Sequence, residues 1–286
     1  NVNENYFHGE IDFWNKCMIH GTYDEFWQSR NTLNYFSDVK PAVMVVGGWY
    51  DNEDLYGTLN TYQTIERKNE DNKNILVMGP WYHGGWSRSK GDTFGDMEFG
   101  SSTSEFYREE MESQFFKYYL KGEGDYNLPE AYVFETGKNV WHKYNEWPPS
   151  NTAWTPIYFS DNSELTFTEE KNSKTQFDEY VSDPANPIPY TSVSQNAGRM
   201  YYRFYMTEDQ RYASKRSDVL TYQTIPLDED FTIAGPIRVE LFVSTSGTDS
   251  DWIVKLIDVF PDSISEGKDM SGLSDDGQGR YNERKI

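Results

Sequence analysis

The sequence PAVMVVGGWYDNEDLYG (residues 41–57), followed by NILVMGPWYHGGW (residues 74–86), determines the fold that we expect for this chain. Residues 43–46 are apolar and mostly β-branched, and two glycines end this run, as in a buried parallel strand. Residues 74–78 form a second such run, which a Gly-Pro pair terminates. Between the two runs, apolar residues recur at helical spacing at Leu55, Leu59, Tyr62 and Ile65. The stretch therefore predicts a strand, a crossover helix and a parallel strand.

Two titratable residues follow the ends of these strands. Asp51 comes after the first strand, and His83 comes after the second. Because parallel strands of such a unit end at one edge of the sheet, we expect the acid and the imidazole to lie close together there. Asp before His is also the order of the last two residues in the Ser-Asp-His triad of α/β-hydrolases. In that triad, the Asp orients the His, and the His takes the proton of the nucleophile.

The same residues also have a purely structural interpretation. Asp51 or Asn52 could be the N-cap of the following helix. Glu53 and Asp54 would then complement the helix dipole. His83 could be a turn residue that is hydrogen-bonded to the backbone. Spacing alone leaves both interpretations open.

The motifs GGWYDNED and GPWYHGGW resemble those of the α-amino-acid ester hydrolases, cocaine esterases and glutaryl acylases. This group belongs to the X-Pro dipeptidyl-peptidase superfamily of α/β-hydrolases. The resemblance extends over most of the chain and implies a serine hydrolase with Asp51 as the triad acid and His83 as the triad base. In the amino-ester hydrolases, a Glu and an Asp after the triad acid help to bind the α-ammonium group of the substrate. Glu53 and Asp54 occupy those two positions.

The sequence lacks a nucleophilic serine in the motif that an α/β-hydrolase needs. A G-x-S-x-G elbow should precede the triad acid, and no such pentapeptide occurs here. Ser87 and Ser89 lie near His83, but the sequence WSRSK around them lacks the flanking glycines of the strained turn. We therefore expect the C-terminal part of a longer enzyme, whose missing N-terminal part holds the Ser and the oxyanion hole. The chain alone should be inactive.

Periodicity divides the chain into two predicted parts. We expect residues 1–125 to be the C-terminal portion of an α/β-hydrolase domain, ending in a helix from about Ser104 to Lys121. The apolar stripe of this helix consists of Tyr107, Met111, Phe115 and Tyr118. We expect residues 126–286 to be a jelly-roll β-sandwich domain, incomplete at its end, because many short strand-like runs follow one another.

Several local predictions belong to this outline. Residues 131–137 should form a strand, and WHKYNEWPP (residues 141–149) should be a connection. Residues 237–243 alternate in the manner of a half-buried strand, with Ile237, Val239, Leu241 and Val243 facing inward. Near the start, Thr22 with Glu25 fits the capping box of a short helix.

Composition limits the classes of function. The net charge of -21 argues against binding nucleic acid, because a phosphate backbone needs a basic surface. The charge suits a site that accepts cationic substrates. No apolar run approaches the ~20 residues that span a bilayer. The chain begins without Met or an apolar leader, so we expect a mature or truncated start. The resemblance implies an exported and oligomeric enzyme.

The sequence predicts no cofactor and no metal. One cysteine and four histidines make a structural zinc site improbable, and we expect Cys17 to pack in the core. Three functions remain open at this point. The first is an α-amino-acid ester hydrolase or amidase, β-lactam acyl groups included. The second is a cocaine-esterase-like carboxylesterase or a glutaryl acylase. The third is a carbohydrate-binding β-sandwich module without catalysis.

Overall fold

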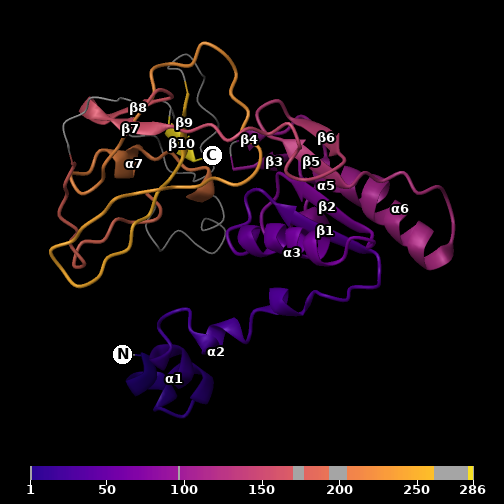
Figure 1. Cartoon of the computed structure of the whole chain (residues 1–286), viewed down its shortest axis with the longest axis horizontal. Helices are drawn as coiled ribbons and strands as arrows, with labels where there is room; N and C mark the ends of the chain where they lie inside the picture. The colour runs from indigo at the N-terminus through magenta and orange to yellow at the C-terminus, as the bar shows by residue number, and fades with distance from the viewer. Residues whose placement is uncertain (1, 96, 170–176, 193–204, 261–282, 286) are drawn as a thin grey trace. The chain divides into compact units, whose positions relative to one another are not determined.

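The structure is a computed structural model that describes residues 2–95, 97–169, 177–192, 205–260 and 283–285. The chain folds as two compact units (Figure 1). The first unit comprises Asn1–Val45 and Tyr56–Asn74, and the second comprises Val46–Leu55 and Ile75–Ile286. Both Asp51 and His83 belong to the second unit, so the candidate site is described within that unit alone.

The first unit is mainly helical. Its longest helix is α3 (Leu55–Lys68), which buries Tyr62 and Ile65 as the predicted spacing requires. Two basic residues in its last turn stabilise the helix, because their positive charges lie at the negative end of the helix dipole. Four short helices precede it: a π-helix at Asn3–Phe7, α1 (Asp12–Ile19), α2 (Glu25–Gln28) and a 3₁₀ helix at Thr32–Tyr35. None of these four buries a residue, and Cys17 is only partly buried, so its predicted place in the core is wrong.

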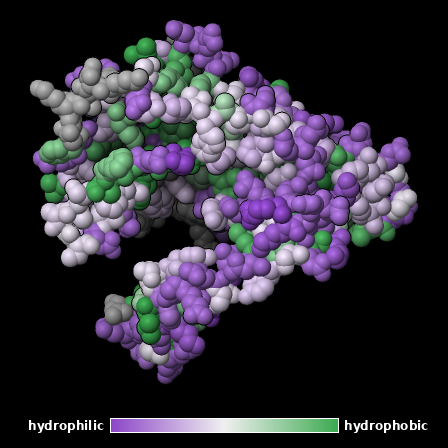
Figure 2. All heavy atoms as spheres, in the orientation of Figure 1, coloured by the Kyte–Doolittle hydropathy of each residue, from purple (hydrophilic) through white to green (hydrophobic). Residues whose placement is uncertain are grey.

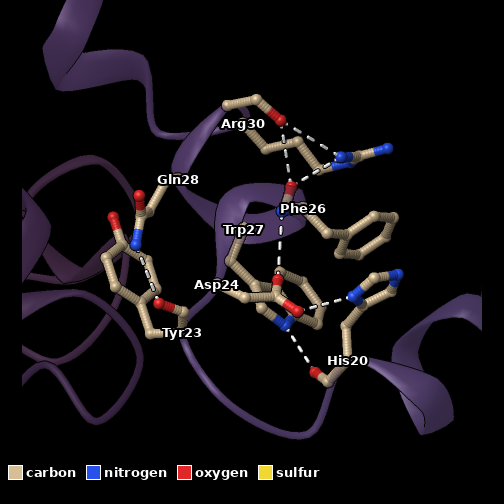
Figure 3. A network of polar contacts seen from close by, with 8 residues as sticks. His20, Tyr23, Asp24, Phe26, Trp27, Gln28 and Arg30 are labelled. Atoms are coloured by element: carbon tan, nitrogen blue, oxygen red, sulfur yellow. Dashed lines mark hydrogen bonds and ion pairs between the residues drawn. The ribbon is translucent and has the colours of Figure 1, made fainter.

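A hydrogen-bonded network caps α2 (Figure 3). The side chain of Asp24 accepts a hydrogen bond from the backbone N–H of Phe26 at 3.0 Å, and its other oxygen lies 2.6 Å from Nδ1 of His20. The ring of His20 stacks on Phe26, and the guanidinium of Arg30 lies 3.7 Å from the centre of the same ring. Asp24 is therefore the N-cap, and the predicted capping box of Thr22 is wrong. The cap falls on Asp24 because it directly precedes the first helical residue.

The second unit is built on a sheet in the order β1-β2-β5-β6 (Figure 1). The strands are β1 (Val43–Gly48), β2 (Asn74–Gly79), β5 (Ala131–Glu135) and β6 (Val140–Tyr144). β2 pairs with β5 in parallel, and β5 pairs with β6 antiparallel. Every residue of β2 is buried, which explains its uninterrupted apolar sequence. The two predicted strands around the candidate site are confirmed, and they are neighbours in the sheet.

The prediction that residues 141–149 form a connection is wrong for the first part of this segment, which belongs to β6. Val140–Tyr144 is a strand, and the turn before it contains Gly137 at φ +87° and Asn139 at φ +57°. Positive φ at Gly and Asn is typical of tight hairpin turns, and this signal was missed. β5 and β6 lie beyond the expected boundary at 125/126, and they share one sheet with β1 and β2.

A continuous helical run from residue 103 to residue 121 confirms the predicted helix. It alternates between α and π hydrogen bonding, in α5 (Thr103–Phe106), a π segment (Tyr107–Glu112), α6 (Ser113–Phe116) and a second π segment (Lys117–Lys121). Gly122 ends it at φ +67°. Tyr107, Met111 and Phe115 are buried, but Tyr118 is 39% exposed. The wider π turns rotate Tyr118 out of the predicted stripe. In the described part of the chain, no helix has both the length and the apolar character that crossing a bilayer requires.

The remaining elements of the second unit are short, and no jelly roll can be traced in the described residues. They are β3 (Thr93–Phe94), β4 (Met97–Glu98), β7 (Tyr158–Ser160), β8 (Glu164–Thr166), α7 (Arg211–Ser214), β9 (Ile257–Val259) and β10 (Glu283–Lys285). The six strands among them form three antiparallel pairs, β3 with β4, β7 with β8, and β9 with β10. One of the short strand-like runs on which the predicted sandwich rests, RMYYRFYM (residues 199–206), lies mostly outside the described residues.

The predicted strand at residues 237–243 is wrong. This segment forms no strand, and its supposedly inward residues Ile237 and Val243 are exposed. Phe242, which the alternation would place on the opposite face of a strand, is exposed as well. Figure 2 shows hydrophobic side chains at the surface of the region that Figure 1 draws in orange and yellow. An alternating sequence forms a strand only when a neighbouring strand satisfies its backbone, and no described residue does so here.

Candidate active site

Asp51 lies in the turn after β1 and is only 4% exposed. Its two carboxylate oxygens face one nitrogen of His83, with Oδ2 at 3.0 Å and Oδ1 at 3.2 Å from Nδ1. A buried carboxylate in this position favours the tautomer of His83 that carries a proton on Nδ1. The structure therefore brings together the two residues that follow the two strands.

His83 lies in the turn after β2, where Gly84 at φ +72° reverses the chain. Its side chain is 45% exposed, in contrast to the buried acid. Its ring and that of Trp86 form a T-shaped pair, with the ring centres 6.4 Å apart. Nδ1 is engaged by Asp51, so Nε2 is the nitrogen that can accept a proton from an outside group.

Glu53 and Asp54 follow the acid in the same turn, and both are exposed. Oε2 of Glu53 lies 3.8 Å from Nε2 of His83. This carboxylate therefore faces the side of the imidazole that Asp51 does not contact. Asp54 contributes its backbone N–H to the turn.

The capping interpretation of Asp51 describes a second role of the same side chain. Oδ1 accepts hydrogen bonds from the backbone N–H groups of Glu53 at 2.8 Å and Asp54 at 3.0 Å. These bonds fix the turn that leads into α3 and leave Oδ2 to face His83. One carboxylate thus organises its own loop and orients the imidazole, so the two interpretations do not compete.

Two glycines allow the two strand ends to approach each other. A Cβ on Gly48 would lie 2.0 Å from the carbonyl oxygen of Trp81, and a Cβ on Gly79 would lie 2.4 Å from the Trp81 ring. That carbonyl accepts a hydrogen bond from the backbone N–H of Tyr50 at 3.0 Å. The G-G-W-Y-D and G-P-W-Y-H motifs are therefore packed backbone against backbone, which no side chain larger than hydrogen would permit.

An aromatic core supports both turns. Trp81 is buried, and its Nε1 donates to Oγ1 of Thr103 at 2.8 Å. The ring of Tyr50 stacks on Phe94 with centres 4.8 Å apart. Burial, with the nearby charge of Glu112, raises the pKa of Tyr107, so this phenol stays neutral beside Trp81. Trp81 and Tyr50 thus pack against the core beneath the two turns.

The serines that lie near His83 in the sequence point elsewhere. Ser87 donates to the carbonyl of Gly84, and Ser89 donates to the carbonyl of Gly85. Within the described part of the chain, the polar contacts of His83 are those with Asp51 and Glu53. The described residues also contain no group of three or more His, Cys, Asp or Glu that could hold a metal ion.

Sequence reasoning missed two polar residues that hold this region together. Thr103 begins α5 and is fully buried, where it pairs with Trp81. Glu135 ends β5 and contacts Lys138 at 2.9 Å and Nε2 of His142 at 2.6 Å. The pairing of His142 with Glu135 follows from the register between β5 and β6, which no local sequence pattern indicates.

Neighbouring strands that end in an acid and an imidazole are how α/β-hydrolases arrange the last two residues of their triad. The comparisons with known proteins agree with this class. A family model described as the X-Pro dipeptidyl-peptidase C-terminal non-catalytic domain matches residues 118–285, and one described as X-Pro dipeptidyl-peptidase (S15 family) matches residues 4–85. The chain belongs to the X-Pro dipeptidyl-peptidase family.

Three similar proteins are informative. Cocaine esterase of Rhodococcus sp. is 30% identical over 261 residues, which cover 86% of this chain and 43% of the esterase. A solved α-amino acid ester hydrolase is 32% identical with a TM-score of 0.82, and the match covers 92% of this chain and 44% of that one. An aminopeptidase from a Thaumarchaeota archaeon is 34% identical with a TM-score of 0.71, covering 77% and 36%. The chain thus spans less than half the length of each relative.

Proposed function

We propose that the chain carries the acid and the base of a Ser-His-Asp triad in a serine hydrolase that cleaves esters or amides of α-amino acids. The observation that carries this proposal is the contact of the buried Asp51 carboxylate with Nδ1 of His83 at 3.0 Å. It is supported by the likeness to an α-amino acid ester hydrolase with a TM-score of 0.82. The nucleophilic Ser and the oxyanion hole would lie on a part of the enzyme outside these residues.

The proposed reaction has two halves. In the first, Nε2 of His83 takes the proton of the Ser hydroxyl as Ser Oγ attacks the substrate carbonyl, and Asp51 stabilises the imidazolium. His83 then gives this proton to the departing alcohol or amine, which leaves an acyl-enzyme. In the second half, His83 takes a proton from water, the water oxygen attacks the acyl group, and the Ser recovers its proton as the acid is released.

Glu53 and Asp54 would bind the α-ammonium group of the substrate. The carboxylate of Glu53, 3.8 Å from Nε2 of His83, faces the side of the imidazole where the reacting bond must lie. Charge-assisted hydrogen bonds from an ammonium group to two carboxylates are stronger than neutral ones. The net charge of -21 favours the approach of a cationic substrate as well.

A carboxylesterase without amine specificity is the second candidate. The 30% identity to cocaine esterase over 86% of this chain favours it. Such an enzyme would use Asp51 and His83 in the same way and would have no need of the acidic pair. The acidic pair of Glu53 and Asp54 is therefore the feature that distinguishes an amino-ester hydrolase from a carboxylesterase. A glutaryl acylase would have no need of this pair either.

Labelling with a fluorophosphonate tests the triad. The full-length enzyme is treated with the probe, digested and mapped by mass spectrometry. We expect the label on the Ser of a G-x-S-x-G peptide outside residues 1–286, and we expect its loss in His83→Ala. A correctly folded full-length enzyme that takes no label, or whose labelling survives His83→Ala, would contradict the proposed mechanism.

A pair of substrates tests the amine site. In the full-length enzyme, Glu53→Gln with Asp54→Asn should raise KM for an amino-acid ester at least about tenfold and change KM for the matching ester without the amine by less than about twofold. Glu70→Gln with Asp71→Asn is the control, because it removes two adjacent charges from an exposed turn elsewhere. Equal effects on both substrates would favour the carboxylesterase.

The expected division at residues 125/126, the oligomeric state and export remain predictions. The sheet that β1, β2, β5 and β6 share gives the C-terminal region a direct structural connection to the candidate site. We propose that residues 1–125 belong to the hydrolase domain, whose sheet β5 and β6 extend, and that the non-catalytic β domain lies within residues 126–286.

A further inference from the structure

Trp49 lies two residues before Asp51 and is held by three contacts from other segments. Its backbone N–H donates to the carbonyl of Gly79 at 2.9 Å. Its indole Nε1 donates to the carbonyl of Phe134 in β5, also at 2.9 Å. Its ring packs against Trp147, with centres 6.1 Å apart and planes inclined by 46°. The orientation of the acid turn therefore depends on residues more than 80 positions further along the chain.

Trp147 is in turn supported from the C-terminal region. The next residue, Pro148, lies against Gly235, where an added Cβ would stand 3.1 Å from Cγ and 3.2 Å from Cβ of the proline ring. Gly235 has φ +102°, a conformation that residues with side chains rarely adopt. The backbone conformation favours glycine at position 235, and the close approach of Pro148 means that a side chain there would press on the segment that carries Trp147.

A second connection lies three residues earlier in the same region. Oγ1 of Thr232 donates to Oε1 of Glu135 at 3.3 Å, and Nζ of Lys138 lies 2.9 Å from the same oxygen. Glu135 directly follows Phe134, whose carbonyl holds the indole of Trp49. The two connections from residues 232–235 thus reach the two groups, Trp147 and Phe134, that hold Trp49 in place.

We propose that Trp147 is a positioning residue for the triad acid, and that Gly235 of the C-terminal region keeps Trp147 in position. This inference rests on the proposed function, because it assumes that Asp51 acts on His83. Trp147 acts through Trp49 on the direction of the Asp51 carboxylate. A misplacement of about 1 Å in a catalytic group can reduce the rate about a hundredfold. The non-catalytic region would then contribute to kcat without contacting the substrate.

The test uses the full-length enzyme and four substitutions, of which two perturb the support of Trp49, one is conservative and one is a control. Trp147→Leu removes the ring that supports Trp49, and Gly235→Val pushes Pro148 away while it leaves Trp147 intact. For both, we expect kcat to fall about tenfold or more while KM stays within about twofold. The conservative Trp147→Phe should restore most of kcat. Trp154→Leu is the matched control, because Trp154 is 70% exposed, and its loss should leave kcat unchanged.

A spectroscopic readout separates positioning from mere support of the fold. The proton of the His83–Asp51 hydrogen bond should give a downfield resonance in the wild type, which Trp147→Leu and Gly235→Val should shift or broaden. If both variants lower only the melting temperature and keep kcat and this resonance, the inference is wrong. If His83→Ala loses activity but Trp147→Leu keeps full activity, the inference about Trp147 is also wrong, while the proposed function is unaffected. Full activity in His83→Ala overturns both.

Discussion

Both oxygens of Asp51 face Nδ1 of His83, at 3.0 and 3.2 Å, although 32 positions separate the two residues in the sequence. Oδ1 also accepts the backbone N–H groups of Glu53 and Asp54. The carboxylate therefore has one role that needs its negative charge and another that needs only an acceptor oxygen. Two substitutions at this position can separate these roles.

Asp51→Asn should remove the charge and keep the turn. The amide oxygen of Asn accepts hydrogen bonds from the N–H groups of Glu53 and Asp54 as well as a carboxylate oxygen does. Catalysis should suffer, because a triad with Asn in place of Asp stabilises the wrong tautomer of His and loses about 10⁴-fold in kcat. We expect that loss in ester hydrolysis by the full-length enzyme, with little change in the melting temperature.

Asp51→Ala should impair both roles. Loss of the two turn hydrogen bonds should lower the free energy of unfolding by roughly 0.5–2 kcal/mol relative to Asp51→Asn, the cost of removing a helix cap. Urea denaturation of the two variants measures the difference. If Asp51→Asn retains the wild-type kcat, Asp51 is only a turn residue and the triad assignment is wrong.

Gly48→Ala should destabilise the second unit. A Cβ at this position would lie 2.0 Å from the carbonyl oxygen of Trp81 and 2.6 Å from its carbon, both in the backbone, which cannot move aside as a flexible side chain can. We expect the free energy of unfolding to fall by at least roughly 1–3 kcal/mol, measured by urea denaturation.

Gly21→Ala is the control for this substitution. Gly21 has no positive φ and no atom within 4 Å of an added Cβ. It should leave stability unchanged or raise it by about 0.4–1 kcal/mol, because Ala restricts the unfolded chain. A Gly48→Ala variant as stable as the control would mean that the two strand ends do not approach each other as described.

The strand-helix-strand unit could be predicted because each of its elements is specified locally. β2 is apolar at nearly every position because it is buried on both faces, and Tyr62 and Ile65 lie on the buried face of α3. The meeting of Asp51 and His83 follows from topology, since each residue comes directly after a strand. Their distance does not follow from the sequence, because it depends on Gly48 and Gly79 and on their fit to Trp81.

The C-terminal region could not be predicted in the same way. The alternation from Ile237 to Val243 indicates a strand, but a strand depends on hydrogen bonds to a neighbour that alternation does not identify. β6 was missed for the related reason that its identity as a strand depends on pairing with β5 through the turn at Gly137. Ion pairs such as that of Glu135 with His142 follow from this register, and register is not a local property.

Glu135 should make stability depend on pH. Partial burial acts to raise the pKa of this carboxyl, but its close contacts with Lys138 and His142 outweigh it and hold the pKa below its usual value. A lowered pKa in the folded state stabilises the protein above the pKa of the unfolded state. This contribution is lost as the pH falls through the folded pKa, so acidification below about pH 5 should reduce stability.

The comparison of Glu135→Gln with the wild type measures this contribution. The free energy of unfolding of the variant should fall less between about pH 5 and pH 3, since it has no such carboxyl to protonate. Glu146→Gln, which changes an exposed carboxylate of the same segment, should follow the wild-type curve. Parallel curves for Glu135→Gln and the wild type would show that the ion pairs of Glu135 contribute nothing in solution.

Thr103→Val tests the buried support of the histidine turn. The hydroxyl of Thr103 accepts from Nε1 of Trp81 at 2.8 Å and donates to the carbonyl of Gly91 at 2.6 Å. Val has nearly the same shape but leaves the indole N–H of Trp81 buried and unpaired, while the carbonyl of Gly91 keeps only the 3.3 Å hydrogen bond from the backbone N–H of residue 103. This loss should lower the free energy of unfolding by roughly 1–3 kcal/mol. Thr103→Ser keeps the hydroxyl and loses only a methyl group, at a cost of roughly 1 kcal/mol.

Because the Trp81 carbonyl also holds Tyr50, next to Asp51, Thr103→Val should lower kcat as well, and Thr103→Ser should not. Equal stability of the two variants in urea denaturation would mean that packing, and not the hydrogen bonds, holds Trp81 beneath the turns that carry Asp51 and His83.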